Sequence, residues 1–364
     1  MTKYKLKTYG LFIAAAAALA AVFLVISGTG ADNGKAPVVG LVLTGKADDS
    51  GWNGAHYEGV AYACERLGTE VIIKENIREG NGSCAEAIHE LVREGAQMII
   101  LSSYSYPSEA REVIAEYPDI AFYGISSEYV SDNLTSYFGR MYQARYLAGI
   151  AAGMETESNS IGYVAAMPNN EVNRGINAFT LGVKSVNPDA SVYVSWTNSW
   201  DSSQEEIAAV NKLITDKNAD IITYHQNQHN AAQAADEAGV YSIGYNQTVE
   251  GLSDRYLTAA VWDWNSLYFQ IIREFVQGQP NAVERHWFSI DSGAVALSEL
   301  SEQVSDDTRR AVVDAENKLH STDYVFSGVI YDNNGVMRCG EGEYLSDDTL
   351  LTGMDWFVEG VVIY

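Results

Sequence analysis

Short apolar runs alternate with longer stretches of helical periodicity along the chain from Pro37 onward. The runs have the length and the Val- and Ile-rich composition of strands that are buried on both faces. In the first part of the chain they are residues 38–43, 70–77, 98–103 and 120–126, with helical stretches at 54–67, 83–96 and 107–118. Ser83 is the expected N-cap of the second helix, with Glu86 completing a capping box. This alternation predicts a parallel sheet with right-handed crossovers.

The same alternation restarts after a long helix rich in closely packing Ala and Gly, residues 140–154. The later strands are expected at 160–167, 191–197, 220–226 and 240–246, with helices at 171–186, 203–217 and 228–239. After Leu257 come "LTAAVWDW", a helix through Gln277, a helical stretch from about 302 to 319 and a hairpin around "DNNG". Two α/β units with later segments returning to them predict a two-lobed binding protein with a hinge.

The lobes have approximate boundaries in the sequence. We expect residues 37–137 plus roughly 258–285 to form lobe 1. Residues 138–257 plus part of 286–364 form lobe 2, with C-terminal segments packing on the lobes. Hinges are expected near residues 136–139 and 258–264.

Residues 1–36 have the pattern of an export signal or an N-terminal anchor. Three lysines at positions 3, 5 and 7 precede an unbroken apolar run from Leu11 to Ile26. This charge order places the rest of the chain outside the cytoplasm. The run has no Cys near its end, which excludes a lipoprotein anchor, and no clean cleavage site distinguishes a cleaved signal from a retained anchor.

Composition argues against several classes of function. The 364-residue chain carries a formal net charge of −25, which argues against nucleic acid and against docking on an anionic membrane surface. Its three cysteines, Cys64, Cys84 and Cys339, leave at least one thiol unpaired. They lack metal-binding spacing, and we expect them to be buried as small hydrophobes.

Candidate chemistry lies in the loops that follow the strands, because open α/β sheets bind ligands beyond the carboxyl ends of their strands. These loops combine aromatic rings with amide and hydroxyl side chains rather than with paired acids. Such a cleft suits a flat, neutral ligand that forms hydrogen bonds. The simpler alternative is that the aromatics only cover the strand ends. The aromatics in or beside these loops are Trp52, Tyr104, Tyr106, Trp196, Trp200, Tyr224 and Tyr245.

Catalytic and metal sites are poorly supported. His225 and His229 have i, i+4 spacing, but no third ligand is evident, and the segment spans a loop and a helix start. His56 and His89 lie within helical stretches and are expected to be solvated or capping. No activated nucleophile or acid/base pair is visible, so we predict no enzyme activity, no metal and no cofactor.

Several blocks of the sequence resemble the basic membrane protein family, and they are closest to its Med-like branch. The blocks are "DDSGWNGAHYEG", "YFGRMYQARYLAGIAAG", "RGINAFTLGVKSVNP", "GVYSIGYN" and "MDWFVEGVV". The resemblance implies an extracytoplasmic solute-binding protein of an ABC importer, with permease and ATPase subunits as partners. It also implies the type I periplasmic-binding fold, with two Rossmann-like lobes, parallel sheets and a three-crossing hinge around a purine base or nucleoside.

The resemblance also assigns roles to single residues. Trp52, the aromatic before Asn53, is placed to stack on the purine, with Asn53 as a polar contact. Trp196 is a candidate for the opposite face of the ring, and Asn246 stands where nucleoside-binding members carry an Asp that holds the ribose. An amide there favours a free base, since it lacks the charge that strengthens a hydrogen bond. The other expected ligand-binding residues are Tyr104, Arg174, Asn198, Gln226 and Trp262.

Three alternatives stay open at this stage. The ligand could be a purine nucleoside, or the protein could be a membrane-anchored purine sensor rather than an importer component. An exported nucleoside hydrolase is the third, although the sequence lacks the clustered aspartates that a metal-dependent hydrolase needs.

Overall fold

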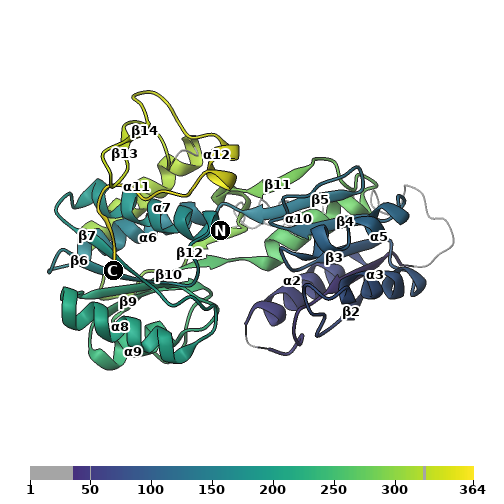
Figure 1. The fold of residues 1–364 in the computed structure, drawn as a ribbon, viewed down its shortest axis with the longest axis horizontal. Coiled ribbons are helices and arrows are strands. Elements are labelled where there is room, and N and C mark those ends of the chain that lie inside the picture. Colours follow the sequence, from purple (N-terminus) through teal and green to yellow (C-terminus); the bar gives the residue numbers. More distant parts are fainter. Residues whose placement is uncertain (1–35, 50, 323–324) are drawn as a thin grey trace, which may run out of the picture.

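A computed structural model describes residues 36–49, 51–322 and 325–364, so the predicted signal or anchor lies almost wholly outside the described residues. The molecule is elongated, with two α/β lobes side by side along its long axis (Figure 1). Each lobe is built on its own mostly parallel sheet, which confirms the predicted fold class.

The first lobe holds a six-stranded parallel sheet in the order β11-β5-β4-β3-β1-β2. The central strands are completely buried, as their unbroken apolar runs predict. In chain order the strands are β1 (Val38–Val42), β2 (Glu70–Lys74), β3 (Met98–Leu101), β4 (Ala121–Ile125), β5 (Leu134–Gly139) and β11 (Arg285–Phe288). The helices are α2 (Trp52–Leu67), α3 (Ser83–Arg93), α4 (Tyr106–Glu109), α5 (Arg111–Glu116) and α10 (Trp264–Val276).

Helix α10 returns from the far part of the sequence and packs along α2. Gly59 of α2 permits the close approach, because a Cβ there would lie 2.8 Å from Cβ of Trp264 and from Cδ2 of Tyr268. This contact brings the aromatic residues of α10 beside the start of α2.

The second lobe holds a seven-stranded sheet in the order β12-β10-β9-β8-β6-β7-β15, in which only β12 is antiparallel. Its strands are β6 (Ser160–Ala165), β7 (Ser191–Trp196), β8 (Ile221–His225), β9 (Tyr241–Asn246), β10 (Tyr256–Trp262), β12 (Val295–Leu297) and β15 (Val361–Ile363). Its helical segments are α6 (Met141–Glu155), α7 (Asn170–Val186), α8 (Ser203–Lys217), α9 (Asn230–Ala238), η1 (Ile290–Ser292), α11 (Asp306–Thr322) and α12 (Asp347–Thr352). The expected hairpin is present as β13 (Ile330–Tyr331) and β14 (Met337–Cys339).

Helices α6 and α7 pack more closely than ordinary side chains allow, as the Ala- and Gly-rich sequence of α6 predicts. A Cβ at Gly149 would lie 2.0 Å from the carbonyl oxygen of Phe179, and one at Gly182 would lie 2.1 Å from that of Tyr146. Glycine is therefore required at both positions.

The chain passes between the two sheets three times: after β5, after β10, and between β11 and β12. Strand β10 pairs with β9, so the second passage follows Trp262 rather than residue 258. Strand β11 pairs with β5, which keeps residues up to Phe288 with the first sheet.

One local expectation is wrong, four strands were not predicted, and one expectation is confirmed. Ser83 does not cap α3: Gly82 precedes the helix with a φ of 83°, and the Ser83 hydroxyl donates to the carbonyl of Arg78 instead. The strands β5, β11, β12 and β15 are not evident in the apolar pattern. All three cysteines are buried, as expected.

Candidate functional site

The carboxyl ends of five parallel strands form one edge of the second sheet. In sheet order, β10, β9, β8, β6 and β7 end at Trp262, Asn246, His225, Ala165 and Trp196. An open parallel sheet offers its ligand crevice at this edge. Two tryptophans therefore stand at the ends of a row whose middle holds the polar Asn246 and His225 and the small Ala165.

Trp52 begins α2 in the first lobe and is held by three contacts. Its indole Nε1 donates to the carbonyl oxygen of Ser102, 2.9 Å away, in the loop after β3. Its ring meets His56 and Trp264 edge to face, at centroid distances of 4.3 and 5.4 Å. The half-buried ring is thus fixed in orientation before any ligand arrives.

The loop before Trp52 is organised by Asp49. One carboxylate oxygen accepts from the backbone N–H groups of Gly51 and Gly54, and the other accepts from Nδ2 of Asn53 at 2.8 Å. The Asn53 side-chain oxygen accepts from Thr44 Oγ1 and from a backbone N–H at residue 45, both at 3.0 Å. Asn53 therefore has a structural role within the loop, and its contact with a ligand stays a prediction.

His56 supports Trp52 from beneath and is completely buried, so the expectation of a solvated or capping residue is wrong. Its Nδ1 makes a short contact with the hydroxyl of Tyr268, which lies 2.8 Å from that of Tyr137. Burial lowers the pKa of His56 to about 3. The imidazole is therefore neutral at physiological pH.

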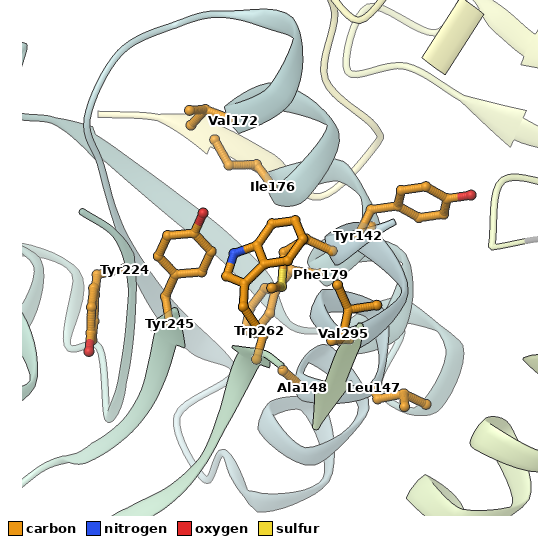
Figure 2. Packing of buried hydrophobic residues seen from close by; sticks show 14 of the residues in the cluster. Tyr142, Leu147, Ala148, Val172, Ile176, Phe179, Tyr224, Tyr245, Trp262 and Val295 are labelled. Atoms are coloured by element: carbon orange, nitrogen blue, oxygen red, sulfur yellow. The ribbon is translucent and has the colours of Figure 1, made fainter. Parts of the chain in front are cut away.

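A second pair of indoles stands where the chain passes from β10 to α10. Trp262 and Trp264 stack at a centroid distance of 4.6 Å and an interplanar angle of 15°. Between them Asp263 caps α10 by accepting from the backbone N–H and the hydroxyl of Ser266. Trp262 projects between Tyr245 and Val295 in the core of the second lobe (Figure 2). The "WDW" sequence thus places two stacked indole rings, those of Trp262 and Trp264, at the passage between the lobes.

A cavity of about 210 Å³ lies against this indole pair. Its lining comes from α2 of the first lobe, from the end of β9 in the second, and from the β10–α10 passage. The lining residues are Ala55, Glu58, Asn246, Gln247, Trp262, Asp263, Trp264 and Asn265. Asn246 is 7% exposed and has a left-handed φ of 73°, a conformation that Asn tolerates better than most residues. Of the predicted ligand-binding residues, Asn246 and Trp262 line this cavity.

The remaining second-lobe candidates lie at or just beyond the strand ends. Trp196 is half-buried, with its ring centroid 6.3 Å from that of Phe357, and Asn198 is exposed. Gln226 is 1% exposed, and its Nε2 donates to Thr197 Oγ1 at 2.8 Å.

Tyr104 and Arg174 complete the set of predicted residues. Tyr104 is 54% exposed in the loop after β3. Arg174 is 4% exposed and donates to the carbonyl oxygen of Leu350 at 2.6 Å, with its guanidinium 5.2 Å from the centre of the Trp287 ring. Arg174 therefore holds the C-terminal segment, and its contact with a ligand stays a prediction.

His225 and His229 do not share a helix face, because His225 ends β8 and His229 immediately precedes α9. The part of the chain that the structure describes has no cluster of three or more side chains suited to a metal ion. The sequence reasoning missed Glu171, whose Oε1 lies 3.9 Å from Nε2 of His225. Its position in the first turn after a strand-end loop was the available signal.

Comparison with known proteins identifies a family and several relatives. The model of the family described as ABC transporter substrate-binding protein PnrA-like matches residues 36–332. A putative ABC transporter glucose-binding protein of Haloferax volcanii is 32% identical, over 92% of this chain and 82% of that protein. A purine-binding protein of Brucella abortus is 31% identical, over 89% of this chain and 92% of that protein. The transcriptional activator protein med of Bacillus subtilis is 24% identical, over 80% and 92%.

Solved structures share the fold. A transcriptional activator of the comK gene from Bacillus halodurans superposes with a TM-score of 0.69 at 24% identity, covering 79% of this chain and 98% of that one. A solute-binding protein of an ABC transporter system from Aeropyrum pernix gives a TM-score of 0.67 at 17% identity, covering 86% and 95%.

Proposed function

Because the chain belongs to the PnrA-like family of ABC transporter substrate-binding proteins, we propose that its ligand is a purine base held between the lobes. Proteins of this family are not enzymes, act outside the cytoplasm, and hand a small molecule to permease and ATPase subunits. No helix within the described ranges is long and apolar enough to cross a membrane. Anchoring by the N-terminal segment is part of the proposal.

The observation that carries the purine proposal is the fixed ring of Trp52. A hydrogen bond to Ser102 and edge contacts with His56 and Trp264 hold it at the carboxyl-end side of the first sheet. Stacking of a base on such a ring contributes about 1–3 kcal/mol, and an immobile ring loses little entropy on binding. Trp196, at the end of β7 in the second sheet, is the proposed opposite face when the lobes close.

Asn246 supports a free base over a nucleoside. Its neutral amide at the cavity can bond a base edge, whereas a ribose is held more strongly by a carboxylate. The purine-binding relative from Brucella abortus, which is 31% identical, favours the same class of ligand.

Glucose is a second candidate, favoured by the similarity to the putative glucose-binding protein of Haloferax volcanii. An indole face also packs against the apolar face of a sugar ring. A sensor role is a third candidate, favoured by the similarity to the Bacillus subtilis activator. Genes for a permease and an ATPase beside this one would favour import.

A thermal-shift panel tests the ligand class. The purified protein is heated with adenine, guanine, hypoxanthine, xanthine, adenosine, inosine or glucose. A ligand at 100 times its Kd adds about 2.7 kcal/mol to the free energy of unfolding. We expect a free purine to give the largest rise in Tm. No rise with any purine at millimolar concentration would refute the proposal, and a rise with glucose alone would favour sugar binding.

The variant Trp52→Ala tests the stacking ring. It should bind purines about 5- to 150-fold more weakly, from the stacking energy above, while its far-UV circular dichroism stays that of the wild type. Trp52→Phe, which keeps a smaller ring, should retain part of the affinity. Unchanged purine affinity in Trp52→Ala would show that the ring only covers the strand end.

A further inference from the structure

Two adjacent buried side chains at the end of β8 have polar atoms without partners. His225 is 2% exposed and Gln226 is 1% exposed. Within residues 36–49, 51–322 and 325–364, neither ring nitrogen of His225 has a hydrogen-bond partner. The side-chain oxygen Oε1 of Gln226 has no donor there either. A buried polar atom without a partner costs about 1–3 kcal/mol, so such atoms call for an explanation.

Glu171 faces His225 from the first turn of α7. Its Oε1 lies 3.9 Å from Nε2 of His225, which is too far for a hydrogen bond, and its side chain is 32% exposed. The N-terminus of α7 is already capped, because the side chain of Asn169 accepts from the backbone N–H of Val172 at 3.0 Å. Capping therefore does not account for Glu171.

The charges around these groups are set by two buried arginines. Arg145 is completely buried and donates to the carbonyl oxygen of Tyr224 at 2.8 Å, with its guanidinium 4.3 Å from the centre of the Tyr245 ring. Burial, with the positive charges of Arg145 and Arg174, lowers the pKa of His225 well below its usual value. Burial raises the pKa of Glu171, and the same two arginines act in the opposite direction. His225 is therefore neutral and offers one donor and one acceptor.

We propose that Glu171, His225 and Gln226 form a recognition surface for the hydrogen-bond donor edge of the ligand, with Glu171 accepting from an exocyclic amino group. The surface offers the two carboxylate oxygens of Glu171, Oε1 of Gln226 and one nitrogen of His225, so acceptors outnumber donors. A purine that carries an amino group complements it, and a counterpart without that group leaves acceptors unpaired. This inference rests on the proposed purine-binding function and narrows it to amino-substituted purines.

Two matched ligand pairs test the inference: adenine against unsubstituted purine, and guanine against hypoxanthine. Affinities are measured by tryptophan fluorescence titration of the wild type, Glu171→Gln and the control Glu205→Gln. Glu205 is a matched control, since it is an exposed glutamate in the first turn of α8 in the same lobe.

We expect the wild type to prefer the amino-bearing member of at least one pair by about tenfold or more, as for a hydrogen bond to a charged group. Glu171→Gln should reduce that preference by about tenfold, with little change in affinity for the other member. Glu205→Gln should behave as the wild type. The Tm of each ligand-free variant separates loss of recognition from loss of fold.

The outcomes distinguish two failures. If the wild type binds no purine, the proposed function itself is wrong. If the wild type binds purines but has no preference within either pair, or if Glu171→Gln keeps the wild-type preference, the recognition role of Glu171 is overturned while purine binding stands.

Discussion

The burial of His56 beneath the ring of Trp52 allows a quantitative prediction of how the stability of the protein changes in acid. His56 has a pKa of about 3 in the folded protein, because burial disfavours its charged form. An unfolded chain holds the same imidazole near pKa 6.5. Between these two values the unfolded state binds a proton that the folded state does not, so the free energy of unfolding falls as the pH falls below about 6.5.

The magnitude follows from the gap between the two pKa values. One pKa unit corresponds to about 1.4 kcal/mol, and pH 5 lies about 1.5 units below the unfolded pKa. His56 alone should therefore remove about 2 kcal/mol of stability between pH 7 and pH 5. Other groups that titrate in this range, His225 among them, act in the wild type and in a His56 variant alike.

The assay is urea unfolding at pH 7 and pH 5 for the wild type and for His56→Asn, which keeps a polar atom near Nδ1 to meet Tyr268 but cannot titrate. The variant should lose about 2 kcal/mol less than the wild type between the two pH values. His89→Gln, at a half-buried histidine of α3, is the matched control and should keep the full loss. Equal losses in the wild type and His56→Asn would refute the reasoning.

Three further predictions concern packing and charge. Arg174→Ala should lower stability in urea unfolding, because the carbonyl of Leu350 loses its donor, and a midpoint equal to that of the wild type would refute this. Gly149→Ala should cost about 1–3 kcal/mol in urea unfolding, since the new Cβ would meet the carbonyl of Phe179, and an unchanged midpoint would contradict this. With a net charge of −25, the protein should show a Tm that rises as NaCl is raised from 0.01 to about 1 M, since salt screens repulsion between exposed acids; a flat profile would count against that repulsion.

Much of the fold could be predicted from the sequence because its central strands have a recognisable local pattern. Strands such as β3 and β6 are apolar runs buried on both faces, bounded by helical stretches. The strands that were missed lie mainly at sheet edges. β11 reads "RHWF" and exists through pairing with β5, about 150 residues earlier in the chain, which no local pattern reveals.

The candidate site was predictable in its location and less so in its contacts. Strand-end loops predicted Trp52 and Asn246 as ligand-binding residues; Asn246 lines the interlobe cavity, and contact of either residue with a ligand stays a prediction. The partners of a polar side chain are a different matter, because they depend on tertiary distances. Asn53 is engaged within its own loop, whereas Arg174 is engaged by Leu350 of the C-terminal segment. Residue type alone could not separate these roles from ligand binding.

The indole pair at the β10–α10 passage links ligand contact to lobe movement. Trp262 belongs to the second sheet and Trp264 to the helix that packs on the first lobe, so their stack spans one passage between the lobes. Gly139, at another passage, lies directly beneath Trp262, where a Cβ would stand 2.4 Å from ring atom Cζ3. We therefore predict that a rotation of one lobe against the other would pivot around these contacts. Because the same two rings line the interlobe cavity, a ligand that filled it would contact the residues at the predicted pivot.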